Sequence, residues 1–262
     1  AFLTAAVDVQ KGRFVVQVEA WGLDLSRVVV DRFDLVTPPE GAPRAGERAL
    51  DPGRYAEDWA VVLGLADRSW PVAGADHRMR PVAVVIDAGG APGVTPNAYA
   101  FWRRARASHP RRFHLVRGRG GERAKRAEVK RPETAHQGKA FVARDVRLIW
   151  AGTDRLKDEV AASLAREAGG ARKLSIPSGA PEELFAEYAA ERRGAKGWEK
   201  RRGVQRNEAL DLSVYALALV IVLEAEALDQ DNPPAWARPG PANQFAVPAD
   251  APEGADGAPP AG

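Results

Sequence analysis

The sequence predicts an α/β fold with a mixed sheet, in which three antiparallel strands are followed by parallel strands and helices flank the sheet. Three apolar segments, residues 3–9, 13–21 and 27–36, are joined by turns short enough for hairpins, as in consecutive antiparallel strands. A helical pattern over residues 54–66 then leads to the continuous apolar run 81–86. A strand reached through such a crossover is expected to run parallel to the first strand.

Helices and short strands alternate along the rest of the chain. Helices are expected over residues 95–107, 153–167, 181–192 and 207–228, and short strands over residues 113–116, 146–150 and 173–176. Thr95 or Asn97 would cap the first of these helices, and Thr153 the second. These elements place residues 1–228 in one domain. Residues 229–262 are rich in Pro, Ala, Gly and Asp, which predicts a disordered tail.

The composition is that of an ordinary globular domain, with 45% hydrophobic and 28% charged residues among 262. The chain contains no cysteine, which excludes disulfides and thiolate metal sites. It also lacks an apolar run long enough to span a bilayer. We therefore expect a soluble protein of a reducing compartment.

Basic charge is concentrated in two segments, although the net charge is only +3. Residues 103–131 carry twelve Lys or Arg against two Glu, and residues 191–206 carry seven against two. From Glu224 onward seven acids face one Arg. Clustered basic charge is typical of proteins that bind a phosphate backbone. A solvated arginine-rich surface is the alternative interpretation.

Asp8 is unusual because it lies inside an apolar strand, between Val7 and Val9. Burying a lone carboxylate is costly, so such a group is usually paired or bound to a metal. Asp87 ends the apolar run 81–86, where a turn or capping role is the competing interpretation.

A third carboxylate, Asp211, lies in the first turns of the apolar helix. Glu208 precedes it by three residues and Asn207 by four, so all three side chains share one helix face. Glu208 alone would be explained by the helix dipole. Together with Asp8 and Asp87 these groups form a plausible site for a hard cation. Oxygen-only ligation favours Mg²⁺ or Mn²⁺ over zinc.

The motifs VDVQKGRFVVQVEAWG, VVIDAGG and RNEALDLSVYALA, in this order, resemble the nuclease domain of phage large terminases of the lambda type, the GpA family. This family belongs to the RNase H-like superfamily, so the resemblance implies an RNase H-like mixed sheet. It extends over about residues 3–228, and the NEALD-to-VYA segment is its most specific part. The resemblance implies a domain that cuts concatemeric viral DNA with two divalent ions, in the cytoplasm of the host cell.

The resemblance also assigns roles to individual residues. Asp8, Asp87 and Asp211 match the acidic motif positions of the family and are expected to be the catalytic metal ligands, with Glu208 in support. Lys157 lies where the family often has a lysine, and either a phosphate contact or a surface charge would explain it. The family implies the small terminase subunit and the portal protein as partners.

The chain lacks the P-loop pattern G-x-x-x-x-G-K-[ST] of the ATPase domain that large terminases carry. The nearest segment, residues 120–125, does not match the pattern. We therefore expect an excised nuclease domain that cuts DNA without ATP-driven translocation. The four histidines show no metal-ligand spacing, and none is assigned a catalytic role.

Double-stranded DNA is expected to contact the glycine-rich loop that follows His114 and the basic segment around Trp198. The residues predicted to bind it are Arg117, Arg119, Arg123, Lys125, Arg126, Lys157, Lys200, Arg201 and Arg202. Trp198 would stack on the DNA or anchor its loop to the body.

Two other functions remain open. A resolvase-like or transposase-like nuclease would share the acidic triad but prefer branched DNA. A non-catalytic docking module of the packaging motor would use its tail to engage the portal and would show no metal-dependent cleavage.

Overall fold

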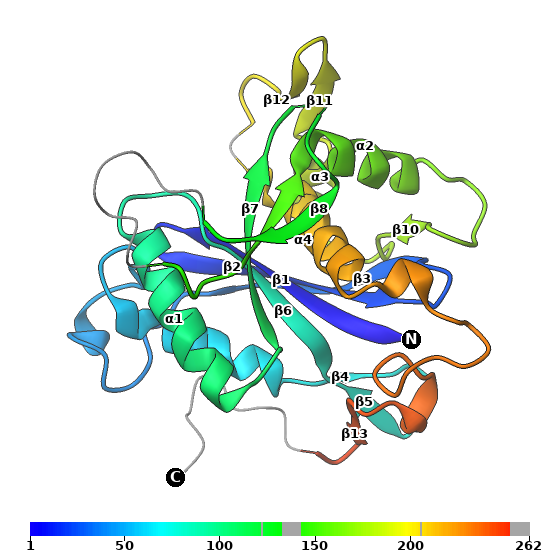
Figure 1. The fold of residues 1–262 in the computed structure, drawn as a ribbon, viewed down its shortest axis with the longest axis horizontal. Coiled ribbons are helices and arrows are strands. Elements are labelled where there is room, and N and C mark those ends of the chain that lie inside the picture. Colours follow the sequence, from blue (N-terminus) through cyan, green and yellow to red (C-terminus); the bar gives the residue numbers. More distant parts are fainter. Residues whose placement is uncertain (122, 133–142, 205, 252–262) are drawn as a thin grey trace.

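The computed structural model describes residues 1–121, 123–132, 143–204 and 206–251. Its main sheet has eight strands in the order β10-β3-β2-β1-β6-β7-β9-β8 (Figure 1). These strands are β1 (Phe2–Gln10), β2 (Arg13–Trp21), β3 (Arg27–Leu35), β6 (Pro81–Asp87), β7 (Phe113–Arg119), β8 (Ala127–Lys130), β9 (Leu148–Gly152) and β10 (Leu174–Ser175). The sheet is mixed, as the sequence predicts.

Strand pairing brings the first strand beside the fourth predicted one. β1 and β2 are antiparallel, with Asp8 opposite Val15, and β2 and β3 are also antiparallel. β1 pairs in parallel with β6, where Val7 lies opposite Ile86. Asp8 and Asp87 therefore follow a matched pair of residues and lie at the same edge of the sheet, where two parallel strands end.

Helices cover both faces of this sheet. Helix α1 (Val94–Ser108) and the 3₁₀ helix η2 (Ala56–Ala66) pack in one apolar cluster, on one face. Helices α2 (Thr153–Leu164), α3 (Glu182–Tyr188) and α4 (Glu208–Val222) pack in a second cluster, on the other face (Figure 1). Helix α4 is buried along most of its length, which explains why its sequence is apolar on nearly every side.

Side-chain alternation decides which face each aspartate joins. In β1, Ala5 and Val7 belong to the cluster of α1, whereas Ala6 belongs to the cluster of α4. Successive side chains on a strand point to opposite faces, so Asp8 is on the α4 side with Ala6. In β6, Val85 is on the α4 side, and Asp87 two residues later follows it. Both aspartates therefore face α4.

Several element boundaries differ from those expected. Residues 56–66 form a 3₁₀ helix, not an α-helix. Gly93 and Gly152 are the N-caps of α1 and α2, in place of Thr95 or Asn97 and of Thr153. Thr95 instead donates a hydrogen bond to the carbonyl of Ala88. The Thr95 hydroxyl is therefore bonded to Ala88 and does not cap the helix.

The helix expected over residues 181–192 ends early, and α4 ends at Val222. A hairpin follows α3, formed by β11 (Glu191–Gly194) and β12 (Gly197–Lys200). In Figure 1 it projects above α2 at the top of the molecule. Its first residue, Glu191, is buried and contacts Lys157 of α2.

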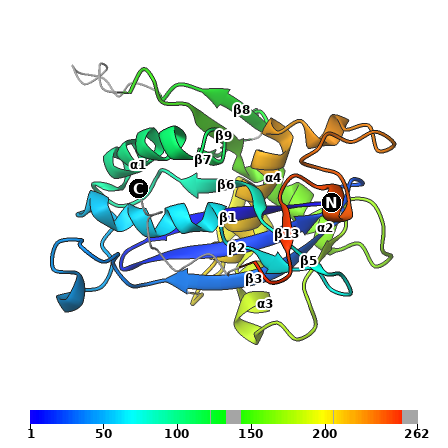
Figure 2. The same cartoon turned by 90° about the horizontal axis from the view of Figure 1, so that it is seen from below.

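The disorder expected after residue 228 is wrong for residues 229–251. Strand β13 (Ala246–Pro248) pairs with β5 (His77–Met79), which pairs with β4 (Trp70–Pro71). Trp236 packs edge-on against Phe2 at a ring distance of 5.1 Å. In Figure 2 this segment lies beside the N-terminus. A few large side chains are enough to dock a segment that is otherwise poor in apolar residues. Residues 252–262 of the predicted tail lie outside the described part.

Within the described residues, the longest apolar helix is still too short to cross a membrane.

We predict that Asn243→Ala lowers the free energy of unfolding by about 1–3 kcal/mol. Asn243 is buried, and its Nδ2 lies 2.8–2.9 Å from the carbonyl oxygens of Ala1, Trp236 and Arg238. Urea denaturation followed by tryptophan fluorescence measures the change. Asn232→Ala is the matched control, because Asn232 is exposed in the same segment. Equal stability of the two variants would show that residues 229–251 do not stabilise the domain.

Candidate active site

The Asp8 carboxylate is buried where β1 ends against α4. Asp8 is only 9% exposed, and its Oδ2 accepts a hydrogen bond from Nε2 of Gln10. The strand must place a residue here on the α4 side, and most residues of that side are apolar. A carboxylate at this position therefore needs a hydrogen-bond donor or a cation from a neighbouring element.

Asp87 meets Asp8 from the neighbouring strand. Its Oδ1 accepts a hydrogen bond of 2.8 Å from the backbone N–H of Gly89, and the hydroxyl of Tyr215 is a second hydrogen-bond partner. A Cβ at Gly89 would lie 3.2 Å from Asp87 Oδ1, so glycine gives the carboxylate room in the turn. Asp87 therefore does stabilise the turn, as one interpretation of the sequence expected, but only one of its two carboxylate oxygens accepts the hydrogen bond from Gly89.

Helix α4 supplies the facing side of the site. Asn207 is its N-cap, and Glu208 and Asp211 lie in its first turn. Tyr215 follows Asp211 by four residues and so lies one turn further along the same face. The sequence analysis did not select Tyr215. A tyrosine at helical spacing from an acidic residue, in a helix otherwise apolar, is the signal that would have found it.

Burial and mutual repulsion raise the pKa values of the three aspartates. Burial raises the pKa of Asp8 from 3.8 to about 7, and the charges of Asp87, Asp211 and Glu208 add to this effect. Burial also raises the pKa of Asp87 and of Asp211. Each carboxylate thus lies close enough to the others to disfavour their ionisation. A cluster with this property is stabilised by a cation.

Lys157 provides part of the missing positive charge. Its Nζ lies 2.8 Å from Asp211 Oδ1 and 2.7 Å from Glu191 Oε2. Lys157 is 8% exposed, so the interpretation of this residue as a surface charge is wrong. The pKa of Lys157 is raised, because the two carboxylates outweigh the opposing effect of burial.

Glu191 and Asn207 complete the surroundings of Asp211. Asn207 Nδ2 donates to Glu191 Oε1 at 2.7 Å and to Asp211 Oδ2 at 3.3 Å. Glu191 was not singled out from the sequence, where it begins a strongly basic segment and resembles an ordinary solvent-exposed acid. Its burial is set by the packing of β11 against α2, for which the local sequence carries no signal.

Glu208 differs from the three aspartates because arginines already neutralise it. Its carboxylate lies 3.4 Å from Arg13 Nη2 and 3.3 Å from Arg206 Nε. Burial would raise the pKa of Glu208, but a backbone hydrogen bond and the charge of Arg206 more than offset it, so the pKa is lowered. Glu208 is therefore an ionised group at the margin of the site, next to the cluster that needs a cation.

The donors fit a hard divalent cation in their chemistry, because carboxylate oxygens are the ligands that Mg²⁺ and Mn²⁺ prefer. In the part of the chain that the structure describes, however, no group of three or more His, Cys, Asp or Glu side chains is arranged to hold a metal ion. Lys157 already contacts Asp211 in this arrangement. The aspartates converge on one place without forming a finished coordination shell.

The nine predicted DNA-binding residues differ in exposure, and Lys157 is buried in the ion pairs described above. The exposed ones are Arg119 at the end of β7, Arg123 and Lys125 in the following loop, and Lys200, Arg201 and Arg202 at and after the end of β12. Arg117 lies near Asp87, whose pKa its charge lowers. Arg126 instead forms ion pairs of 2.6 Å with Glu159 and 2.7 Å with Glu226. Its guanidinium therefore stabilises the fold through these ion pairs.

Trp198 connects the hairpin to the body of the protein. Its indole Nε1 donates to Asp158 Oδ1 at 2.8 Å, and its backbone N–H donates to Asp154. The side chain also packs against the cluster of α4. These contacts agree with the anchoring interpretation of Trp198.

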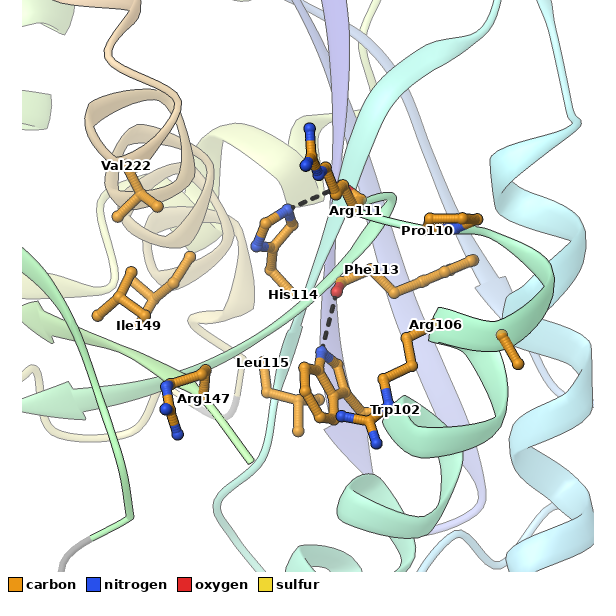
Figure 3. A pocket seen from close by; sticks show the side chains of 12 residues that line it. Trp102, Arg106, Pro110, Arg111, Phe113, His114, Leu115, Arg147, Ile149 and Val222 are labelled. Carbon is orange, nitrogen blue, oxygen red and sulfur yellow. Dashed lines mark hydrogen bonds between the residues drawn. The ribbon is translucent and has the colours of Figure 1, made fainter. Parts of the chain in front are cut away.

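One cavity lies outside this site. It has a volume of about 580 Å³ and lies at the start of β7, between the end of α1 and the end of α4 (Figure 3). Trp102, Leu115 and Ile149 give it apolar walls, and Arg106 and Arg147 lie at its margin. Asp87 pairs with Val116, which does not line the cavity, and the cavity extends back to Pro110 and Arg111, which precede the start of β7.

The contacts of His109 and His114 are with groups other than Asp8, Asp87 and Asp211. His114 lines the large cavity, where its Nε2 lies 3.1 Å from the carbonyl oxygen of Arg111 (Figure 3). His109 Nε2 lies 3.2 Å from Asp67 Oδ2. His136, which was also assigned no catalytic role, lies outside the described residues.

The mixed sheet flanked by helices defines an α/β protein consistent with the RNase H-like nuclease fold. The family model described as the terminase large subunit gpA, endonuclease domain, matches residues 1–232. The chain belongs to this family. No curated protein and no solved structure matched the chain.

We predict that Asp8→Asn stabilises the metal-free protein at neutral pH. Below about pH 3.8 Asp8 is protonated in both the folded and the unfolded state, so its burial costs nothing extra. As the pH rises toward 7, the unfolded chain releases the proton and the folded protein does not, and the free energy of unfolding falls. The gain in Asp8→Asn at pH 8 is on the order of 4 kcal/mol.

Urea denaturation in EDTA at pH 4 and at pH 8 measures this difference. Asp76→Asn is the control, since Asp76 is fully exposed. A gain of equal size at both pH values would mean that the charge of Asp8 does not destabilise the fold.

Proposed function

We propose that this chain is a metal-dependent DNA endonuclease domain that cuts concatemeric double-stranded DNA during viral DNA packaging. The observation that carries the proposal is the convergence of Asp8, Asp87 and Asp211, which are held close enough to raise one another's pKa. Membership of the terminase endonuclease family supports the substrate and the reaction class.

Asp8, Asp87 and Asp211 would hold two Mg²⁺ or Mn²⁺ ions. Bound there, the ions would lower the pKa of an attacking water and stabilise the leaving oxygen of the phosphodiester. Asp8 would contribute to both positions, because it lies near the end of β1 beside β6, which carries Asp87, on the face that α4 covers. Asp87 would serve one position and Asp211 the other, with Glu208 or Asn207 orienting a water.

The surrounding side chains hold the carboxylates in place. The pKa of Tyr215 is raised well above its ordinary value, mainly by burial, so its hydroxyl stays protonated and donates toward Asp87. The N–H of Gly89 fixes the same carboxylate from the turn. Each of these bonds restricts the rotation of Asp87, as groups around a metal ligand commonly do.

DNA would lie across the edge of the sheet where β1 and β6 end. The loop after β7 and the hairpin β11–β12 flank this edge and carry exposed basic side chains. Such contacts give affinity for the phosphate backbone with little sequence preference. Arg126 is not included in this surface because it is paired with Glu159 and Glu226.

In the complete packaging machinery we infer that this domain works with a terminase ATPase domain, the small terminase subunit and the portal protein, in the cytoplasm of the host cell. Its family is defined as the endonuclease part of the large subunit, which supports these assignments. Site choice would come from the small subunit, because basic side chains that contact the phosphate backbone would not read the bases.

We predict that the chain cuts supercoiled plasmid with Mn²⁺ or Mg²⁺ and not with EDTA. Asp8→Asn should reduce the rate by at least about two orders of magnitude, since Asn keeps the shape of the side chain but not the charge that holds the ions. Agarose-gel kinetics measure the rate, with Asp76→Asn as the control. A wild type inactive with both ions would favour the docking module, and a preference for branched DNA would favour the resolvase.

We predict that Arg201→Ala/Arg202→Ala weakens DNA binding and reduces the salt dependence of log K by about 2, because two phosphate contacts are lost. Fluorescence anisotropy with a short duplex in Ca²⁺ buffer at several salt concentrations measures both effects. Arg111→Ala is the control, since Arg111 is exposed at the opposite end of the parallel strands. An unchanged salt slope in the double variant would place DNA elsewhere.

A further inference from the structure

Four buried or half-buried side chains form a closed ring on the α2 side of the site. Lys157 Nζ contacts Asp211 Oδ1 at 2.8 Å and the two oxygens of Glu191 at 2.7 and 2.8 Å. Asn207 Nδ2 contacts Glu191 Oε1 at 2.7 Å and Asp211 Oδ2 at 3.3 Å. Every member therefore touches two others, and the members come from α2, β11 and the start of α4.

Glu191 is the member without an evident role in the proposed reaction. It is 7% exposed and is the first residue of β11. A buried carboxylate is costly, and in the described structure its side-chain partners are Lys157 and Asn207, the two residues that also contact Asp211. Glu191 thus touches Asp211 only through intermediaries.

The charges in the ring explain what Glu191 contributes. The Lys157 ammonium is shared between two carboxylates, and both oxygens of Glu191 contact it, whereas one oxygen of Asp211 does. Without the charge of Glu191, the ammonium would be held by Asp211 alone. A tighter Lys157–Asp211 pair competes with any cation that Asp211 must bind. Glu191 also keeps the amide of Asn207 turned toward Asp211.

We propose that Glu191 is a positioning residue that holds Lys157 and Asn207 so that Asp211 stays available as a cation ligand. This inference rests on the proposed function, in which Asp211 is such a ligand. Because Glu191 begins the hairpin that carries the basic residues 192–202, the same contact ties that hairpin to the catalytic helix.

The test compares Glu191→Gln with Glu19→Gln in the 262-residue chain. Glu19 is a matched control, because it is buried, bonds to Ser213 of α4 and has no contact with the ring. Isothermal titration with Mn²⁺ on the DNA-free protein gives the metal affinity, and plasmid cleavage gives kcat and KM. Thermal unfolding in EDTA gives the stability of each variant.

Glu191→Gln is expected to weaken Mn²⁺ binding and to lower kcat by about 10–100-fold, with KM for DNA unchanged. Glu19→Gln is expected to lower stability without either effect. Adding Lys157→Met to Glu191→Gln should recover Mn²⁺ affinity, because the competing ammonium is removed. A merely structural Glu191 would give no recovery.

Two outcomes overturn the proposal. If Glu191→Gln keeps the Mn²⁺ affinity and kcat of the wild type, Glu191 only stabilises the fold, and the proposed nuclease function stands. If the wild type itself neither binds Mn²⁺ nor cuts DNA, the proposed function fails, and the role of Glu191 fails with it.

Discussion

Repulsion among three aspartates, buried or half-buried between one sheet face and one helix, is the constraint on which the rest of the site depends. Three carboxylates in this position disfavour one another's ionisation, so the fold must supply each with its own partners. These partners are Gln10 for Asp8, Gly89 and Tyr215 for Asp87, and Lys157 and Asn207 for Asp211. The site is consequently spread over many elements, and none of its carboxylates is left without a donor.

The layout of the sheet could be predicted because local sequence patterns indicate its strands and turns. Apolar runs and short turns identify β1, β2, β3 and β6, and the crossover rule orients β6 parallel to β1. Residue parity then places Asp8 and Asp87 on one face. The docking of residues 229–251 was missed because composition there indicates disorder, whereas the contacts of Trp236 and Asn243 are made with the start of the chain.

The aspartates stand out in the sequence, whereas the contacts that most of their partners make with them do not. Asp8, Asp87 and Asp211 interrupt or end apolar segments, which makes a carboxylate conspicuous in the sequence. Lys157, Glu191 and Tyr215 each fit a helix or a basic segment as ordinary residues. Their roles depend on how α2 and β11 pack beside α4, and such contacts between distant segments have no period and no spacing. Arg126 shows the converse case, since its sequence context suggests a free basic residue and its carboxylate partners lie 33 and 100 residues away.

The distribution of the aspartates along the chain bears on how an active molecule is made. Asp8, Asp87 and Asp211 come from the beginning, the middle and the last helix of the domain, and β1 is paired with β6 and packed under α4. Contacts between such distant segments form slowly and late in folding. A chain still being synthesised can build β1, β2 and β3 but has only two of the three carboxylates until α4 has emerged. If these carboxylates hold the ions of the proposed nuclease, only completed molecules would be able to cut DNA.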